Sequence, residues 1–360
     1  MKILLIANHL NVGGITSYLF TLASGLKEKG HQVYLASSGG EWLKKFNTLG
    51  IKCIDVPLKT KQEISFKIIL SFLKLSKEAK KLQIDLVHSN SRTTQVLGNL
   101  LSRFLSIPHV FTCHGFFKPK LSRLLFPCWG KGVIAISQEV KEHLINDLKL
   151  NEKKIVVINN GIDVNRFGDF LTRDSMRKNL KVESNEFLVG IIARLSDVKG
   201  HLYLMQAIHK VIKIFPTTKL LIVGQGKMRE QLIKETDALN IKDKVIFISE
   251  ADNTNEMLSA LDVFVMPSLQ EGLGLALMEA MAQGLPVVGS AVGGIKTLIQ
   301  DKVNGLLVSP ANVEELAQAI LKLLQDSQQR VVLGTNARKF IIENFSKIKM
   351  VDKTEKFYKN

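Results

Sequence analysis

The chain has 360 residues, of which 46% are hydrophobic and 23% charged, a composition that excludes a disordered chain and allows two α/β domains. No apolar run approaches the roughly 20 residues that a membrane-spanning helix needs. The net charge of +16 is unevenly placed, with +12 on residues 1–163, zero on 164–335 and +4 on 336–360. A basic N-terminal half attracts anionic lipid, nucleic acid or a polyanionic substrate.

Strand and helix patterns alternate along the first half of the chain. An amphipathic helix is predicted over residues 15–29 and ends at Gly30. The apolar run of the first strand is too short for the hydrophobic region of a secretory signal peptide, because Asn8 interrupts it. Strands are predicted at residues 2–7, 33–37, 51–56, 86–89, 109–112, 132–136 and 155–158.

A polar stretch over residues 164–186 separates this half from a second series. The alternation in both halves predicts two Rossmann-like α/β domains with a cleft between them and ligands at the carboxyl ends of the strands. The strands of the second series are predicted at residues 187–192, 219–223, 245–248, 263–267 and 286–289.

The three cysteines, Cys53, Cys113 and Cys128, form neither a CxxC pair nor a metal-ligand spacing with the eight histidines. We therefore expect free thiols and a reducing compartment, which points to the cytoplasm.

Paired glycines follow a predicted strand in each half of the chain. Gly13 and Gly14 stand before a helix N-terminus, where they could admit a phosphate, although a plain tight turn explains them equally well. The dinucleotide fingerprint G-x-G-x-x-G is absent there. Gly293 and Gly294 follow the strand at 286–289 and leave the same two interpretations open.

Charged residues follow two strands of the second half. Arg194 and Lys199 come after the strand at 187–192, where a guanidinium and an ammonium could clamp a diphosphate. Glu271 and Glu279 frame a glycine-bearing loop and the helix after it, and a buried Glu279 needs polar partners such as sugar or ribose hydroxyls. Surface cations, a capping glutamate and a solvated glutamate are the alternatives. His114, at the end of the strand at 109–112, is placed for ligand contact or is structural.

Together these segments resemble the family-four retaining glycosyltransferases of GT-B fold, from residue 1 to about residue 358. The most specific likeness is the E-x7-E segment from Glu271 to Glu279 with residues 280–288 after it. It is joined by Arg194 and Lys199, by Gly13-Gly14, by Ala135-Ile136-Ser137 and by Asn160-Gly161-Ile162-Asp163.

The resemblance implies an acceptor-binding domain over 1–165 and a nucleotide-sugar domain over 166–335. A C-terminal helix over 336–360 is expected to cross back to the N-terminal domain. The resemblance also places Arg194 and Lys199 on the donor diphosphate, Glu279 on the ribose, Glu271 on the transferred sugar and His114 near sugar and acceptor. Further donor contacts are expected from Gly13, Gly14, Ile248, Gly272, Leu273 and Gly274, the base lying near Ile248, Glu250 and Ala251.

The resemblance implies a nucleotide-diphosphate sugar, by default a UDP-sugar, as substrate and no cofactor. No D-x-D motif is present, so a metal is not expected, and side-chain cations and helix termini would stabilise the leaving diphosphate. An epimerase of the same fold is the main alternative. A phosphorylase and a silent sugar-nucleotide binder are weaker alternatives. No motif supports a nucleic-acid partner.

A glycan or lipid-linked acceptor, used in polysaccharide or glycolipid synthesis, is expected at the N-terminal domain. The stretch 101–131 combines cations with aromatic side chains, which suits peripheral contact with the anionic inner face of the cytoplasmic membrane. In the helix predicted over 65–82, we expect the stripe Phe66, Ile69, Leu70 and Leu73 to pack in the core, the alternative being that it adds to the membrane contact. The stretch contains Arg103, Lys118, Lys120, Arg123 and Lys131 with Phe104, Phe116, Phe117, Leu121, Leu124, Leu125, Phe126 and Trp129.

Overall fold

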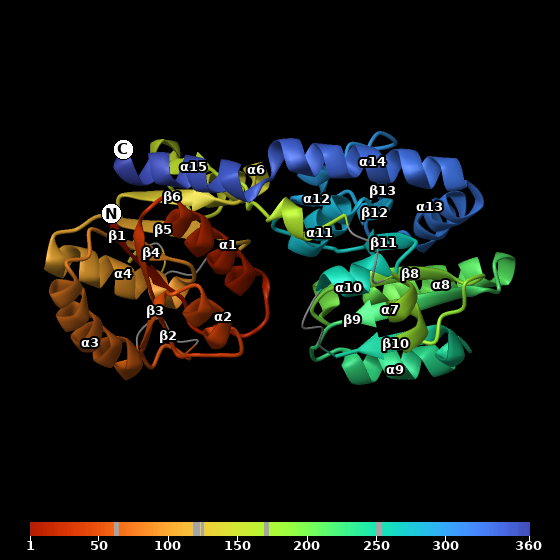
Figure 1. Ribbon diagram of the computed structural model, residues 1–360, viewed down its shortest axis with the longest axis horizontal. Coiled ribbons are helices and arrows are strands. Elements are labelled where there is room, and N and C mark those ends of the chain that lie inside the picture. Colours follow the sequence, from red (N-terminus) through yellow and green to blue (C-terminus); the bar gives the residue numbers. More distant parts are fainter. Residues whose placement is uncertain (61–64, 118–122, 124–125, 169–172, 250–253) are drawn as a thin grey trace. The chain divides into compact units, whose positions relative to one another are not determined.

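The computed structural model describes residues 1–60, 65–117, 123, 126–168, 173–249 and 254–360 (Figure 1). The chain divides into two compact units: unit 1 is Met1–Ile162 with Lys347–Asn360, and unit 2 is Asp163–Ser346. Each unit is built on a parallel sheet, so the predicted pair of Rossmann-like α/β domains is confirmed. The expected boundary between residues 335 and 336 falls inside helix α14 (Ser327–Asn344), which belongs to unit 2.

Unit 1 has, within the described residues, a seven-stranded parallel sheet of order β3-β2-β1-β4-β5-β6-β7. β1 lies inside the sheet because it is apolar on both faces: Ile3 and Leu5 enter one core, Leu4 and Ile6 the other. The strands are β1 (Lys2–Ile6), β2 (Gln32–Ser37), β3 (Lys52–Asp55), β4 (Leu86–Ser89), β5 (His109–Cys113), β6 (Gly132–Ala135) and β7 (Ile155–Val157).

Helices cover both faces of this sheet. α1 (Gly14–Glu28), α2 (Leu43–Thr48) and α15 (Lys347–Lys359) pack on one face, and α3 (Phe66–Leu82) and α4 (Arg92–Leu105) on the other. α6 (Gln138–Asn146) follows β6, and the 3₁₀ turn η1 (Glu152–Lys154) precedes β7. Helix α15 brings Met350, Val351 and Tyr358 into the core of unit 1, so the C-terminal helix does cross back to the N-terminal half.

Unit 2 has a six-stranded parallel sheet among its described residues, of order β10-β9-β8-β11-β12-β13. Its strands are β8 (Phe187–Ile192), β9 (Thr218–Val223), β10 (Val245–Ile248), β11 (Val263–Met266), β12 (Val287–Ser290) and β13 (Leu306–Val308). The three-residue β13 was missed from the sequence, because it is too short to show a periodicity and is defined by its pairing with β12. The strand expected at 286–289 begins one residue later, after Pro286.

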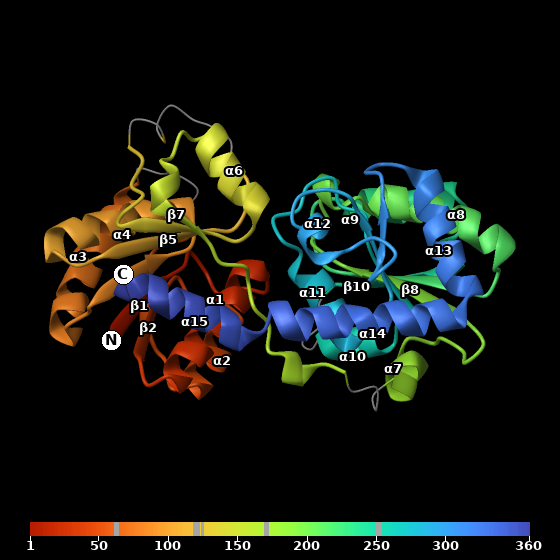
Figure 2. The same ribbon diagram turned by 90° about the horizontal axis from the view of Figure 1, so that it is seen from above.

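The helices of unit 2 also lie on both sides of its sheet. α8 (His201–Ile214) and α13 (Val313–Gln325) lie side by side (Figure 2), while α11 (Leu275–Gln283) packs against α14 and α10 (Thr254–Ser259). α7 (Arg173–Asn179), α9 (Arg229–Ala238) and α12 (Ile295–Leu298) complete the described helices. The 3₁₀ turns are η2 (Val164–Arg166), η3 (Asp197–Lys199) and η4 (Lys242–Lys244).

Polar caps explain where several of these helices begin. A cap side chain accepts a backbone N–H that the first helical turn would leave unpaired. Such caps precede α3, α4, α6, α13 and α14, and the residues are Ser65, Ser91, Ser137, Asn312 and Asp326.

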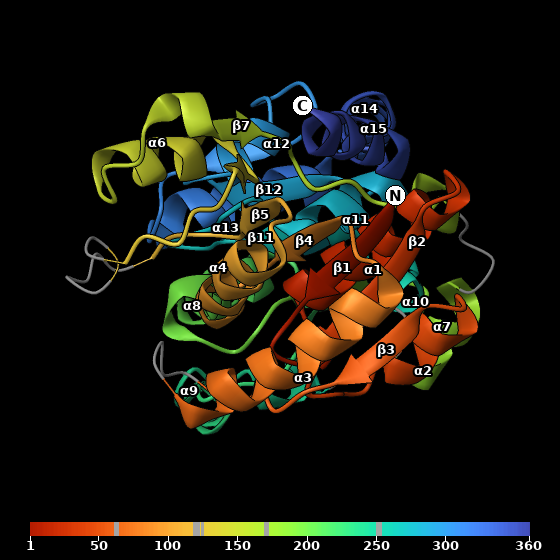
Figure 3. The same ribbon diagram turned by 90° about the vertical axis from the view of Figure 1, so that its left-hand side faces the viewer.

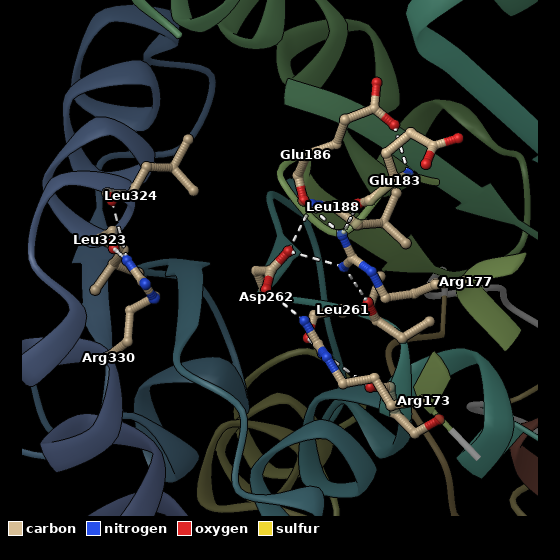
Figure 4. Close-up of polar contacts among 12 residues, drawn as sticks. Arg173, Arg177, Glu183, Glu186, Leu188, Leu261, Asp262, Leu323, Leu324 and Arg330 are labelled. Carbon is tan, nitrogen blue, oxygen red and sulfur yellow. Dashed lines mark hydrogen bonds and ion pairs between the residues drawn. The ribbon is translucent and has the colours of Figure 1, made fainter. Parts of the chain in front are cut away.

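The polar stretch that enters unit 2 is held in place by two arginines that bind the same carboxylate, that of Asp262 (Figure 4). Arg177 donates to the carbonyl oxygens of Glu183 and Glu186, at 2.8 and 2.5 Å, and to Asp262 Oδ2 at 3.2 Å. Arg173 reaches Asp262 Oδ1 at 2.6 Å. Asp262 stands directly before β11, so the cluster ties the chain before β8 to the neighbouring strand. Figure 4 also shows Arg330 of α14 bonded to the last turn of α13.

Among the described residues, no helix combines the length and the apolar character needed to cross a bilayer.

Candidate functional site

Lys199 and Glu271 form an ion pair just beyond the carboxyl ends of the neighbouring strands β8 and β11. The Nζ atom of Lys199 lies 2.6 Å from Oε2 of Glu271, and the two side chains are 21% and 13% exposed. The other carboxylate oxygen accepts the backbone N–H of Gly272 at 3.1 Å. Because this pair is partly removed from water, its charges interact more strongly than they would on an open surface. Two of the expected donor-binding residues therefore meet.

A glycine lets the two loops approach each other. The N–H of Leu269 donates to the carbonyl oxygen of Val198 at 2.8 Å, which joins the loop after β11 to the loop after β8. Gly200 has φ 73° and lies against the carbonyl group of Pro267, where a Cβ atom would overlap it. A side chain at this position would push Lys199 away from Glu271.

Gly293 and Gly294 have a packing explanation, while a phosphate contact at this turn stays a prediction. A Cβ atom on Gly293 would overlap the carbonyl oxygen of Glu271, and one on Gly294 would overlap the backbone of Gly272 and Leu273. The N–H of Gly294 also donates to the Glu271 carbonyl at 3.1 Å. This second glycine pair therefore supports the loop that carries Glu271.

Glu279 lies on α11, which begins after Gly274 (φ 95°) ends the same loop. Its neighbours Met278 and Ala280 are fully buried. Burial raises the pKa of Glu279 to about 7, although a hydrogen bond with Thr254 and the positive charge of Arg166 act to lower it. A partly buried carboxyl group that titrates near neutral pH is a common feature of ligand-binding sites.

Arg194 and Ile248 stand at the ends of other strands on the same edge of the sheet. Arg194 is exposed after β8, and Ile248 is the last residue of β10. The carbonyl oxygen of Ile248 accepts the N–H of Gly224 at 2.8 Å. Glu250 and Ala251, expected near the base, lie outside the described residues.

The turn after β9 is a feature that the sequence analysis missed. Gly224 lies against the carbonyl group of Ala193, and Gly226 against that of Leu195, in both cases too closely for a Cβ atom. These contacts hold the backbone on both sides of Arg194. A G-x-G sequence directly after a predicted strand was the signal that could have indicated it.

In unit 1, Gly13 is the N-cap residue of α1 and Gly14 is its first residue. A Cβ atom on either glycine would meet no other atom within 4 Å, and the backbone of Gly13 is extended. Neither crowding nor a left-handed conformation requires glycine here. This favours close approach of a ligand over the plain tight turn.

His114 follows β5 and is held by two neighbours in unit 1. Its Nε2 atom lies 3.1 Å from Oδ1 of Asn90, and its ring meets the ring of Tyr18 edge-on at 4.6 Å between centroids. Burial lowers the pKa of His114 to about 3, so the ring is neutral at physiological pH. Asn90 was not singled out from the sequence, although it directly follows β4, the strand that pairs with β5.

The expected site residues form two sets, and all except Glu279, which lies inside α11, stand at or just beyond a strand end or at a helix start. Unit 2 holds Arg194, Lys199, Ile248, Glu271, Gly272, Leu273, Gly274 and Glu279, and unit 1 holds Gly13, Gly14 and His114. The cleft expected between the domains stays a prediction. Within the described part of the chain, no three His, Cys, Asp or Glu side chains are grouped to hold a metal ion, and independence of metal likewise stays a prediction.

The expected core stripe of α3 is wrong. Phe66, Ile69, Leu70 and Leu73 are 70%, 54%, 42% and 59% exposed. The helix carries a second apolar stripe, which runs along its whole length, and the sheet buries that one. Its members are Ile68, Phe72, Leu75, Ala79 and Leu82.

The stretch 101–131 also differs from expectation. Trp129 is buried against Phe111, and Phe117 stacks on the same ring, so neither is an exposed anchor. Phe104 and Phe126 are exposed. Lys118, Lys120, Leu121, Leu124 and Leu125 lie outside the described residues.

Two family models match the chain: Glycosyltransferase Family 4 over residues 12–166 and Glycosyl transferases group 1 over residues 172–340. An Escherichia coli protein, UDP-Gal:alpha-D-GlcNAc-diphosphoundecaprenol alpha-1,3-galactosyltransferase, is 29% identical over 326 residues, covering 86% of this chain and 84% of that protein. The N-acetyl-alpha-D-glucosaminyl L-malate synthase of Bacillus anthracis is 27% identical over 365 residues, covering 97% and 94%. The structure of Anabaena HepE in complex with UDP and glucose superposes with a TM-score of 0.89 at 24% identity, covering both chains completely.

Proposed function

The chain belongs to the family-4 glycosyltransferases of GT-B fold, and from this premise we propose that it transfers a sugar from a UDP-sugar to a glycan or lipid-linked acceptor, with retention of anomeric configuration, in polysaccharide or glycolipid biosynthesis. The observation that carries the proposal is the pairing of Lys199 with Glu271 on a loop that leads directly to Glu279. UDP as the carrier is supported by the HepE complex, and a lipid-linked acceptor by the name of the Escherichia coli relative.

Arg194 and Lys199 are proposed to bind the donor diphosphate. Negative charge grows on the diphosphate as it leaves, and preorganised cations stabilise that charge more than water does. Lys199 donates a hydrogen bond to Glu271. Donor binding would turn the ammonium toward a phosphate oxygen and leave the Glu271 carboxylate to accept hydrogen bonds from the sugar hydroxyls.

The proposed chemical step breaks the bond between the anomeric carbon and the phosphate oxygen and forms a bond to the acceptor oxygen. In one route the acceptor attacks the same face of the sugar that the diphosphate leaves, and the acceptor hydroxyl gives its proton to the departing phosphate. The alternative is a covalent glycosyl intermediate on Glu271. Both routes retain the anomeric configuration, and neither requires a metal or cofactor, because Arg194, Lys199 and the start of α11 can take the place of a metal.

The remaining contacts follow from where each residue stands. Glu279, the fifth residue of α11, is proposed to accept hydrogen bonds from the ribose hydroxyls. The backbone at Ile248 is proposed to read the base, and the α1 start at Gly13 and Gly14 to contribute N–H groups to the diphosphate. His114 is proposed to contact the sugar or the acceptor.

The exposed face of α3 supports a peripheral membrane contact at the cytoplasmic side. Phe66, Ile69, Leu70 and Leu73 recur at helical spacing and form one exposed stripe. Lys77, Lys80 and Lys81 continue the same stripe toward the end of the helix and are exposed. Helix α4 lies beside α3 (Figure 3), and its exposed residues Leu100 and Phe104 extend the apolar part. We name these nine residues the α3–α4 surface and propose that it binds anionic lipid, where a lipid-linked acceptor is found.

A thermal-shift screen with UDP, GDP and ADP, and then with their sugar conjugates, tests the donor. We expect UDP to raise the melting temperature most. The anomer of the product that forms first, read by NMR, should match the anomer of the donor.

Arg194→Ala and Lys199→Ala should each lower the rate by roughly 10²–10³, as loss of one preorganised charge stabiliser does. Lys210→Ala is the matched control, because it removes an exposed lysine from an ion pair with Glu314. Near-normal turnover in both site variants would refute the proposed role of Arg194 and Lys199 in binding the diphosphate.

A further inference from the structure

A row of polar side chains lies on one face of two neighbouring strands in unit 1. Residues alternate between the two faces of a strand, so every second residue of β4 and β5 faces α1 and α15. On that face the apolar residues near the amino ends give way to polar ones near the carboxyl ends. In β4 the sequence is Leu86, His88 and then Asn90, and in β5 it is Val110, Thr112 and then His114.

The row is a connected hydrogen-bond network that begins at the C-terminal helix. The hydroxyl of Tyr358 lies 2.6 Å from His88 Nδ1, and His88 Nε2 lies 2.7 Å from Thr112 Oγ1. The hydroxyl of Tyr18 lies 3.2 Å from the same oxygen, and its ring contacts His114. Tyr358, His88, Thr112 and Tyr18 are buried. Buried and mutually bonded polar groups hold one another in fixed orientations.

Asn90 is the neighbour whose chemistry acts directly on His114. Its amide nitrogen lies 3.4 Å from the carbonyl oxygens of Ile6 and His88, to which it can donate, so the amide oxygen faces His114. That oxygen lies 3.1 Å from Nε2 of His114. An amide oxygen accepts hydrogen bonds and cannot donate them, so Nε2 must carry the proton. A neutral imidazole has one ring proton, and Nδ1 therefore keeps its lone pair.

We propose that Asn90 is a positioning residue that holds His114 as its Nε2–H tautomer, so that Nδ1 accepts a hydrogen bond from a hydroxyl group of the bound sugar or acceptor. The identity of that hydroxyl rests on the proposed glycosyl transfer, whereas the tautomer is a property of the protein alone. The edge-on ring of Tyr18 keeps the imidazole in this orientation.

The ionisable groups of His88, Tyr18, Cys113 and Tyr358, on the strands and helices that hold His114, are uncharged at neutral pH. Burial lowers the pKa of His88 on β4 to about 3 and raises the pKa values of Tyr18 on α1 and of the adjacent Cys113 on β5. It also raises the pKa of Tyr358 on α15. The Arg123 guanidinium opposes the effect of burial on Cys113. A carboxylate introduced at position 90 would therefore be a new charge directly against the ring.

The test compares Asn90→Asp with the wild-type protein by two measurements. Long-range ¹H–¹⁵N spectra distinguish a protonated ring nitrogen from a bare one, and loss of the signals in His114→Gln assigns them. In the wild type we expect a protonated Nε2, a bare Nδ1 and no titration between pH 5 and 8. In Asn90→Asp the carboxylate stabilises the imidazolium, so His114 should titrate at higher pH and an acid limb should appear in the kcat/KM profile. That limb should be absent from the Asn90→Asp/His114→Gln double variant.

Two further variants keep the test independent of folding. Ser89→Ala removes a buried bond of 2.7 Å to His109 on the opposite face of the same strands, so it controls for lost stability. Asn90→Ala removes the acceptor without adding charge, and we expect a mixture of His114 tautomers. A protonated Nδ1 in the wild type, or unchanged spectra in both Asn90 variants, would overturn the proposal. The expected tautomer without any sugar transfer would support the positioning of His114 and count against the proposed function instead.

Discussion

At the scale of single residues, the site is electrostatically organised by contacts among its own side chains. Lys199 does not extend into solvent but is held 2.6 Å from Glu271, and Glu271 is itself fixed by the Gly272 N–H. Glu279 differs from Glu271, because the hydrogen bond and positive charge near its carboxylate do not offset the effect of burial, which raises its pKa to about 7. A carboxyl group in that state gains most from new hydrogen-bond donors, such as ribose hydroxyls.

The raised pKa of Glu279 predicts a pH dependence of donor binding. In its proposed role the Glu279 carboxylate accepts hydrogen bonds from ribose hydroxyls, so the deprotonated form should be the one that binds. Because the pKa is about 7, affinity for UDP should rise by about tenfold from pH 6 to pH 8, as the deprotonated fraction grows. Isothermal titration calorimetry at pH 6, 7 and 8 measures this dependence.

Glu279→Gln should bind UDP more weakly and with no such dependence. Glu314→Gln is the control, since an exposed partner, Lys210, holds the pKa of Glu314 below its usual range and keeps it charged throughout. An equal pH dependence in Glu279→Gln would show that another group is responsible.

At the scale of elements, helix α1 shows two glycines with different physical roles. Gly14 at its start has open space where a Cβ atom would stand, whereas Gly25 lies against the side chain of Val351 on α15. The first leaves room for a ligand, and the second lets the C-terminal helix pack closely. Both are glycines in one helix, and the difference lies in what the tertiary structure places beside each.

Gly14→Ala and Gly25→Ala should therefore separate binding from stability. Gly14→Ala should leave the melting temperature unchanged or slightly higher, because alanine favours the helix, but should weaken UDP binding. Gly25→Ala should lower the free energy of unfolding by about 1–3 kcal/mol through overpacking against Val351, with UDP affinity retained in the folded fraction. Thermal unfolding and calorimetry on both variants measure these effects. Unchanged UDP affinity in Gly14→Ala would refute the role of this helix start in the site.

At the scale of the whole molecule, the charge is divided between the two halves of the chain. Residues 1–163 carry +12 and residues 164–335 are neutral. In unit 1 the positive charge stands beside exposed apolar side chains on α3 and α4, which is the arrangement that suits a lipid surface.

The α3–α4 surface predicts binding to anionic vesicles. The protein should sediment with vesicles rich in phosphatidylglycerol at low salt, and weakly with phosphatidylcholine alone, because each lysine near an anionic surface contributes about 1 kcal/mol. The variant Phe66→Ser/Leu73→Ser should lose the apolar part of the binding, and Lys77→Glu/Lys81→Glu the electrostatic part. The charge-matched control Lys213→Glu/Lys234→Glu alters exposed lysines of unit 2. Equal sedimentation of all three variants and the wild type would exclude this surface as the contact.

Much of the fold could be predicted from local pattern, because buried parallel strands are continuous apolar runs with polar residues directly after them. The strands at 86–89, 187–192 and 245–248 were predicted with the bounds that the structure shows. Candidate residues could be found by the same rule, since ligands in α/β folds bind beyond the carboxyl ends of the strands. The domain boundary expected between residues 335 and 336 does not coincide with a division in the structure, because it falls inside the continuous helix α14 and no local sequence feature marks it.

The sequence by itself determined the two α/β series, the positions of the charged residues after their strands, and the likeness to a family. The tertiary structure decided which candidates meet, as Lys199 and Glu271 do, and which glycines are required by packing, as Gly293 and Gly294 are. It also decided which of two apolar stripes on α3 is buried, and that Asn90 directs the proton of His114. Periodicity records the preference of a segment for its own conformation, whereas a contact between distant residues depends on the packing of the whole unit.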